Sequence, residues 1–257
     1  MDPASLIGIV LALVALLATM IMEGSSPMAI ILLPPLILVF GGTFGAAIAG
    51  SAMADVKKIG GWFKQALLPP QVPPISDRIQ TLVSLAEKAR KEGLLALEAQ
   101  VKEIDDPFLK RGLQMGIDGT DPEELRSVLE GEISAKKAED KVAAKFFTAM
   151  GGYAPTVGII GTVVGLIHVL ENLSDPGSLG PLIAGAFVAT LWGVLSANIF
   201  WLPMGAKITR ISELQAAQME LLVEGITEIQ AGTSPRAVRL KLTSLVPPSE
   251  VKQQEAA

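Results

Sequence analysis

Two threonines lie in long apolar stretches of this 257-residue chain at positions that suggest cation chemistry. Thr162 lies about nine residues before the polar connection 171–180, and Thr190 lies about nine residues after it. At about 1.5 Å per helical residue, the two hydroxyls reach a similar depth. Together they would offer oxygen ligands to a hard cation that sheds its water, or each would hydrogen-bond a carbonyl of its own helix.

The stretches that hold these threonines belong to a set of four uncharged apolar runs. They are residues 5–22, 28–50, 147–170 and 181–203. An apolar helix of about 20 residues spans the ~30 Å hydrocarbon core of a bilayer, and only a helix or a closed barrel satisfies its own backbone there. The sequence therefore predicts an all-α polytopic membrane protein with four transmembrane helices.

The basic residues predict which side each loop faces. All 21 Lys and Arg lie in 55–145, 207–210 and 236–252, and the connections 23–27 and 171–180 contain none. Basic residues near the ends of spans stay in the cytoplasm, so both termini are expected inside. The run 5–22 lacks a basic segment before it, which favours a span over a signal peptide. Nucleic acid is not an expected partner, and the chain has no cysteine for a disulfide or a thiolate site.

Charge and turn residues divide the chain into four expected parts. A hairpin of the first two spans covers 1–51, a cytoplasmic helical domain 52–146, a hairpin of the third and fourth spans 147–204, and C-terminal helices with a disordered tail 205–257. The pair Pro34-Pro35 is expected to kink the second span. After it, Gly41, Gly42 and Gly45 make a small-residue surface for another helix.

Capping residues predict the cytoplasmic helices. Ser76 and Asp77 are expected to start a helix that runs to about residue 103, and Asp106-Pro107 to start a shorter one. Asp121-Pro122 starts a helix that nothing interrupts before the third span, so this span is expected to continue a long cytoplasmic helix. The fourth span is expected to run on to Gly232, after which Ser234-Pro235 caps a last short helix. A stiff extended connector is expected at 68–74.

No span carries an acid or a base in its middle, although a transporter normally needs one to carry its ion. The single histidine, His168, is interpreted as a polar residue at the membrane interface.

Gly158, Gly161 and Gly165 share one face with Thr162 and predict a close helix contact. The cytoplasmic acids show no metal spacing, phosphate loop or nucleophile–base pair. Neither an enzyme nor a cofactor is expected.

Five patches of the chain resemble the A subunit of the bacterial flagellar stator, the MotA/PomA family. They are VFGGTFGA at 39–46, ARKEGLLALE at 89–98, APTVG at 154–158 with Gly165-Leu166, ATLWG at 189–193 with Pro203, and QAGTSPR at 230–236. The four spans, the long loop after the second span and the inside termini agree with this family. The order and spacing of the patches carry the resemblance.

The resemblance implies an assembly in the bacterial cytoplasmic (inner) membrane. Five A subunits would surround two copies of a single-span B subunit of the MotB/PomB type, each bringing an intramembrane Asp and a peptidoglycan-binding domain. Cations would pass inward, turn the A ring around the anchored B dimer and drive a rotor C-ring protein of the FliG type. Membrane lipids would surround the complex. A chain without an intramembrane carboxylate would thus borrow one from its partner.

The resemblance also assigns roles to single residues. Arg90 and Glu98 match the charges that face the rotor; eight residues apart on one helix, they would point within about 80° of each other. Pro155 and Pro203 match two prolines of conformational coupling, with a helix kink as the alternative role. Tyr153 and Pro155 are assigned to the ion path with Thr162 and Thr190. In related proteins a threonine at the position of Thr162 goes with sodium, so the resemblance favours transient sodium binding at Thr162 and Thr190 over proton transport.

Other functions compete with this interpretation. A TolQ/ExbB-like subunit also forms a pentamer around two helices and energises the cell envelope, but it has three spans and an outside N-terminus. A stand-alone channel or transporter would need a charge in mid-membrane or an inverted repeat, and the sequence has neither. A structural scaffold would not require a single-span partner that carries an intramembrane Asp.

Overall fold

The structure is a computed structural model that describes residues 2–69 and 72–247, and within these residues every regular element is helical. This confirms the predicted all-α class. The chain divides into two compact units. The first unit consists of Met1–Pro70 and Asp140–Arg210, and the second consists of Gln71–Glu139 and Ile211–Ala257. The disordered tail predicted for the C-terminus falls largely on 248–257, outside the described residues, as do two residues of the connector 68–74.

Three helices of the described residues are long and apolar enough to cross a membrane: Pro3–Met22, Pro122–Glu171 and Pro176–Gln230. The first, α1, starts at the capping carboxylate of Asp2. The second, α9, begins after Asp121, whose Oδ1 accepts the backbone N–H of Glu123 at 2.9 Å. The prediction of one uninterrupted helix from Asp121 through the third apolar run is confirmed.

The third of these helices contains a π-helical turn. It consists of α10 (Pro176–Ser196), the turn η4 (Ala197–Trp201) and α11 (Leu202–Gln230). Gly232 follows it with φ +70°, a left-handed conformation that glycine adopts without a steric cost. Then Ser234 caps α12 (Pro235–Ser244) by accepting the N–H of Ala237 at 3.3 Å. The predicted stop at Gly232 and the predicted last helix are confirmed.

The second apolar run is shorter as a helix than the sequence predicts. A 3-10 turn, η1 (Pro27–Ile30), precedes α2 (Leu33–Leu36), a π-helical turn η2 (Ile37–Gly41) and α3 (Gly42–Ala49). The expected kink at Pro34-Pro35 was wrong, because both prolines lie in the first turn of α2, where the missing N–H costs no hydrogen bond. The apolar helix Leu33–Ala49 is shorter than the other three candidates.

An aromatic cluster forms part of the core of the first unit. The helix α5 (Ile59–Leu67), which follows α4 (Met53–Val56), buries Ile59, Trp62 and Ala66. Phe63 of α5 meets Phe147 of α9 edge to face at 5.0 Å between ring centroids. Fully burying an aromatic ring of this kind contributes about 1.5–3 kcal/mol, so this cluster fixes α5 against α9.

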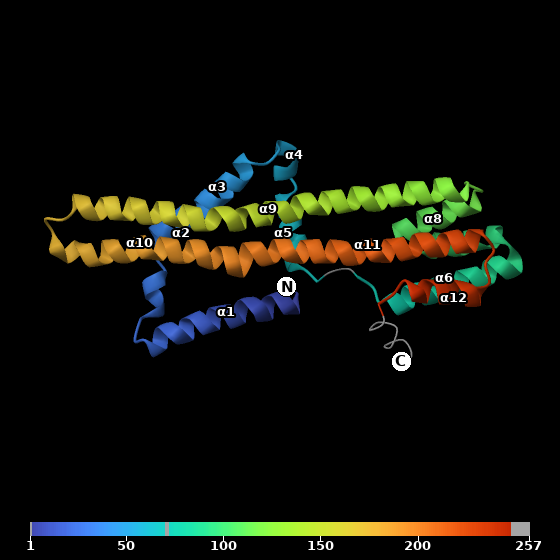
Figure 1. Cartoon of the computed structure of the whole chain (residues 1–257), viewed down its shortest axis with the longest axis horizontal. Helices are drawn as coiled ribbons and strands as arrows, with labels where there is room; N and C mark the ends of the chain where they lie inside the picture. The colour runs from blue at the N-terminus through green and yellow to red at the C-terminus, as the bar shows by residue number, and fades with distance from the viewer. Residues whose placement is uncertain (1, 70–71, 248–257) are drawn as a thin grey trace. The chain divides into compact units, whose positions relative to one another are not determined.

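The second unit packs short helices against the long ones. Its core is formed by α6 (Ile75–Glu92), η3 (Leu94–Leu97), α7 (Glu98–Glu103) and α8 (Pro107–Ile117) together with parts of α9, α11 and α12. Helices α6 and α12 lie side by side (Figure 1). Asp106 caps α8 as predicted, accepting the N–H groups of Phe108 and Leu109.

One predicted helix of this unit was wrong. The helix expected to run from Ser76 to about residue 103 ends at Glu92, because Gly93 adopts φ +87°. An L-residue in the middle of a right-handed helix cannot have this φ, and a glycine that adopts it redirects the chain. A 3-10 turn and the separate helix α7 follow.

Candidate functional site

The candidate site lies where α9 and α10 touch without intervening side chains. A Cβ placed on Gly193 would lie 2.6 Å from the carbonyl oxygen of Ala154, and one on Gly158 would lie 2.8 Å from that of Ala189. Further along, Cβ atoms placed on Gly161 and Gly165 would lie 2.6 Å and 2.7 Å from the Cβ atoms of Ala189 and Ala186. Figure 1 shows the two helices side by side. The close helix contact predicted from the glycines is confirmed.

This contact brings the two predicted threonines together. The hydroxyls of Thr162 and Thr190 hydrogen-bond each other across the two helices. The Thr162 hydroxyl also lies 3.2 Å from the carbonyl oxygens of Gly158 and Ala186, and the Thr190 hydroxyl lies 3.4 Å from that of Gly158. Both side chains are half-buried. The cluster therefore contains two hydroxyl oxygens and two carbonyl oxygens within reach of one another.

Sequence reasoning left two roles open for these hydroxyls, and the structure shows contacts of both kinds. Thr162 bonds back to a carbonyl of its own helix, as Ser and Thr often do in helices. It also bonds groups of α10, which a purely intrahelical role does not require. Ala186 was not expected at the site, because it contributes a backbone carbonyl, which the sequence of side chains does not reveal.

The chemistry available at this cluster is that of uncharged oxygens. Hydroxyl and carbonyl oxygens are ligands that hard cations accept in place of water. No Asp, Glu, Lys or Arg occurs in 147–170 or 181–203, so the chain itself brings no charge to this depth. Among the described residues, no group of three or more His, Cys, Asp or Glu side chains is arranged to hold a metal ion.

Tyr153 and Pro155 lie elsewhere on α9. They precede Thr162 by nine and seven residues, which at 1.5 Å per residue is roughly 10–14 Å along the helix. The Tyr153 hydroxyl lies 3.8 Å from the position of a Cβ on Gly50, at the end of α3. Pro155 lies inside α9, where its missing N–H leaves the carbonyl of Gly151 without its intrahelical donor. The structure therefore does not bring these two residues into the threonine cluster.

Pro203 lies in the first turn of α11, directly after the π-helical turn Ala197–Trp201. A proline cannot donate to the carbonyl four residues earlier, and a π-helical turn is one of the ways in which a helix accommodates an irregular hydrogen-bond ladder. Pro203 is exposed, and Phe200 and Met204 beside it are half-buried. This segment is the most irregular part of the long helix Pro176–Gln230.

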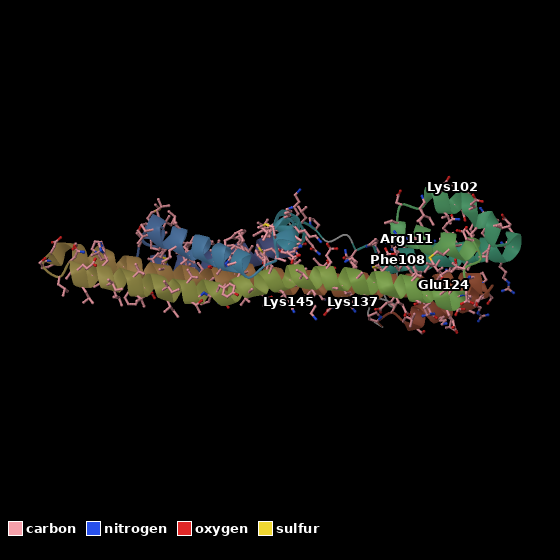
Figure 2. The ribbon with its side chains drawn as sticks, turned by 90° about the horizontal axis from the view of Figure 1, so that it is seen from above. Lys102, Phe108, Arg111, Glu124, Lys137 and Lys145 are labelled. Carbon is pink, nitrogen blue, oxygen red and sulfur yellow. The ribbon has the colours of Figure 1, made fainter. Side chains whose placement is uncertain are left out.

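The geometry predicted for Arg90 and Glu98 was wrong. Arg90 lies in the last turn of α6 and Glu98 in the first turn of α7, on opposite sides of the break at Gly93, so the 80° angle of one continuous helix does not apply. Both side chains are exposed. Glu98 forms an ion pair with Lys102, one turn later on α7, at 3.1 Å, and Figure 2 shows Lys102 on the surface of this helix. No ion pair of Arg90 occurs within the described residues.

A charge network joins three helices of the second unit. Glu224 of α11 pairs with Arg126 of α9 at 2.7 Å and with Lys241 of α12, and Lys241 also pairs with Glu228 at 2.5 Å. Burial raises the pKa of Glu224, but hydrogen bonds from Lys241 and Arg126 outweigh it and leave this pKa below its usual value. The hydrogen bond from Lys241, with a second one from Thr233, lowers the pKa of Glu228.

His168 lies in the last turn of α9, with its side chain 58% exposed and Nδ1 3.4 Å from a carboxylate oxygen of Glu171. It also borders a cavity of about 570 Å³ lined mainly by apolar residues of α2, α9 and α10. In the structure His168 makes no contact with the threonine cluster. Its interpretation as a polar residue at an interface remains a prediction.

Comparison with known proteins supports the resemblance inferred from the sequence. Residues 100–221 match the MotA/TolQ/ExbB proton channel family, and residues 6–93 match the family described as motility protein A N-terminal. Motility protein A of Bacillus subtilis (strain 168) is 35% identical over 247 residues, which cover 96% of this chain and 92% of that protein.

Two solved structures resemble the fold over nearly its whole length. The structure of C. jejuni MotAB matches with a TM-score of 0.92 and 30% identity, covering 96% of this chain and 97% of that one. The flagellar MotAB stator complex of Bacillus subtilis matches with a TM-score of 0.90 and 34% identity, covering 97% and 98%.

Proposed function

The chain belongs to the MotA/TolQ/ExbB proton channel family as a flagellar stator ion-channel subunit, and we propose that it forms an ion-driven rotary motor with a single-span B subunit. The observation that carries the proposal is the oxygen cluster at Thr162 and Thr190, in helices that contain no charge of their own. A cation that crosses this contact needs a counter-charge, because an isolated charge in the bilayer is costly. The B subunit supplies it as an intramembrane Asp.

The match to the motility protein A N-terminal family favours the stator over a TolQ/ExbB-like energiser of the envelope. It covers residues 6–93, which include most of α1 and the whole apolar helix Leu33–Ala49. A TolQ/ExbB-like protein has one span fewer. The B-subunit partner is supported by the two MotAB complexes that share the fold.

Sodium is the cation that we propose for this path. A proton needs a carboxylate and a chain of water, whereas a sodium ion that loses water gains from each additional oxygen ligand. Thr162, Thr190 and the carbonyls of Gly158 and Ala186 place four such oxygens together. Transport would run inward across the bacterial inner membrane, with both termini of the chain in the cytoplasm.

The second unit would transmit torque from the complex to the rotor. We propose that Arg90 and Glu98 meet the rotor ring, a FliG-type protein, because both are exposed and lie on the two helices that flank Gly93. Exposed charges of opposite sign steer a partner protein to its binding site and fix its position there, and they contribute little to the stability of the fold. Pro155 and Pro203 would let the long helices bend as cations pass.

Co-expression of the chain with its B subunit tests the proposal. Native mass spectrometry of the purified complex should give five copies of this chain to two of the partner, and sodium flux into vesicles should stop when the partner's intramembrane Asp becomes Asn while assembly persists. A symmetric tetramer, or sodium flux through the chain alone, would contradict the proposal. Flux that depends on pH and not on sodium would make the transported ion a proton.

A further inference from the structure

Helix α1 is held to the first unit mainly at its first residues. None of its residues is buried, although it packs against η1 and η4. At its start, the backbone N–H of Asp2 donates to the carbonyl of Leu67 at the end of α5 at 2.8 Å. The Asp2 carboxylate accepts a hydrogen bond from the ammonium group of Lys207 on α11 at 2.9 Å. Polar contacts at one end therefore join α1 to two other helices.

The Asp2–Lys207 ion pair is largely shielded from solvent. The side chains are 15% and 20% exposed, and Ser5 completes the group by accepting from Lys207 at 2.8 Å. Asp2 also caps α1, because Oδ2 accepts the backbone N–H of Ser5 at 3.2 Å. The hydrogen bond from Lys207 is the main reason that the pKa of Asp2 lies below its usual value. One carboxylate thus starts α1 and binds α11 at the same time.

Lys207 lies about one helical turn beyond Pro203. The irregular segment from Ala197 to Pro203 is the place where the helix α10–α11 can bend most easily, because its hydrogen-bond ladder is already interrupted. A change of angle at this segment moves Lys207 with the start of α11. Whatever is bound to Lys207 is displaced with it.

Beside the contact of α1 with η4, a cavity of about 460 Å³ lies between α1 and this segment. Gly8 and Ile9 of α1 line it on one side, and Phe200, Pro203 and Met204 line it on the other. Densely packed side chains resist rearrangement because any change of volume is felt. The cavity removes this resistance, so the angle at Pro203 can change while the ion pair keeps the two helices joined.

We propose that Asp2 and Lys207 form a latch that makes α1 follow the bend of α11 at Pro203 during the motor cycle. The proposal rests on the proposed function, because the bend at Pro203 is driven there by cation passage. Asp2 and Lys207 are positioning residues in this scheme. They act through α11 and leave the binding of the cation to the threonine cluster.

Two variants separate the ion pair from the helix cap. Asp2→Asn retains a side-chain oxygen that caps α1, since Asn is as good a capping residue as Asp, but removes the charge. Lys207→Met retains most of the apolar stem and removes the ammonium group. Lys207→Arg retains a donor to Asp2 and should behave as wild type. Lys64→Met is the control, because it removes the same charge from an exposed lysine of α5.

The readout is the distance between α1 and α11 in the assembled complex. The chain contains no cysteine, so cysteines introduced at the exposed positions Leu11 and Ala206 take spin labels selectively. Electron–electron double resonance, on complexes with one labelled copy, should show a narrow distance distribution that broadens in Asp2→Asn and in Lys207→Met. The double variant should broaden it no further, because partners in one interaction do not add.

Swimming speed is the second readout. Each single variant should lose speed while it retains the B subunit, and the double variant should lose no more than the worse single. An unchanged distribution in both single variants, or broadening in Lys64→Met, would overturn the latch. If Asp2→Asn prevents assembly, the comparison of Lys207→Met with Lys207→Arg decides in the same way. A wild-type complex that conducts no cation refutes the proposed function instead, whatever the distances show.

Discussion

The hydroxyl of Thr162 on α9 hydrogen-bonds the hydroxyl of Thr190 on α10, at a contact where glycines let the two helices touch. Two short side chains on neighbouring helices meet only if the backbones come this close. The oxygen cluster therefore depends on Gly158 and Gly193 as much as on the threonines themselves. Variants of the threonines test the contribution of the hydroxyl groups, and variants of the glycines test the contribution of the close helix contact.

Replacing Thr162 by Ala should weaken sodium binding. The substitution removes one oxygen that a dehydrated cation uses, and a hydrogen bond to a charged group contributes about 1.5–3 kcal/mol, so the sodium concentration for half-maximal speed should rise roughly tenfold or more. The helix should persist, because Ala is a better helix former than Thr. Swimming speed against sodium concentration at fixed pH measures the effect.

Thr156→Ala provides the matched control, because within the described residues the Thr156 hydroxyl bonds only the carbonyl of Tyr153 in its own helix. It should leave the sodium dependence unchanged. Wild-type swimming at the same speed with and without sodium would contradict the proposed ion and reduce Thr162 and Thr190 to helix packing.

Replacing Gly193 by Ala should push α10 away from α9. The added Cβ would lie 2.6 Å from the carbonyl oxygen of Ala154, a backbone atom that cannot move by a change of rotamer. Overpacking of this kind costs about 1–3 kcal/mol, so the purified complex should unfold at a lower temperature and conduct less sodium.

Gly152→Ala is the control, because among the described residues no atom outside its chain neighbours and the nearby backbone of its own helix lies within 4 Å of its Cβ position. Ala is favoured over Gly in a helix by about 1 kcal/mol, so this variant should be as stable as wild type or more stable. Equal loss of stability in the two variants would show that the close contact with α10 is not the cause.

Reversing Arg90 to Glu, or Glu98 to Lys, should abolish or weaken swimming without loss of the assembled complex. Both side chains are exposed. Glu98→Lys also places like charges at Glu98 and Lys102, which costs only about 0.2–0.5 kcal/mol. The measurements are swimming speed and the yield of complex that co-purifies with the B subunit, with rescue by a reversed charge on the rotor protein.

Lys137→Glu is the comparison for the rotor variants. Lys137 is an exposed lysine of α9 that Figure 2 shows on the surface, and its reversal should leave swimming intact. Loss of expression in Arg90→Ala would identify a structural role for this residue and contradict its assignment to the rotor.

The charge network of the second unit should make the complex sensitive to acid. The pKa values of Glu224 and Glu228 are lowered in the folded protein. Burial raises the pKa of Glu224, but hydrogen bonds from Lys241 and Arg126 outweigh this effect. The hydrogen bond from Lys241 is the main cause of the lowered pKa of Glu228. The stability that this contributes is present above the ordinary glutamate pKa and is lost as the pH falls through the lowered values.

Lys241→Met tests the acid sensitivity. It removes the donor shared by both glutamates, so the unfolding temperature at neutral pH should fall, and its further decline in acid should become shallower than in wild type. Lys137→Met should leave the unfolding temperature and its pH profile unchanged. Parallel pH profiles of wild type and Lys241→Met would show that the network does not contribute.

Much of the fold could be predicted because capping and helix-breaking residues act locally. Asp121-Pro122, Ser234-Pro235 and Gly232 begin and end helices as expected. Two local features were misjudged. Pro34-Pro35 starts a helix where a kink was expected, and Gly93 breaks a helix that was expected to continue, because the same residue types permit either outcome and the surrounding packing selects one.

By itself the sequence determined the apolar runs, the helical class and the uncharged interior of the third and fourth runs, because these follow from composition and spacing along one chain. It also placed Thr162 and Thr190 at similar depth. Only the tertiary structure decided that their hydroxyls meet, that Ala186 adds a carbonyl, and that Asp2 and Lys207 pair across 205 residues. Such contacts depend on the rotation and separation of helices, and packing of the whole unit sets these quantities.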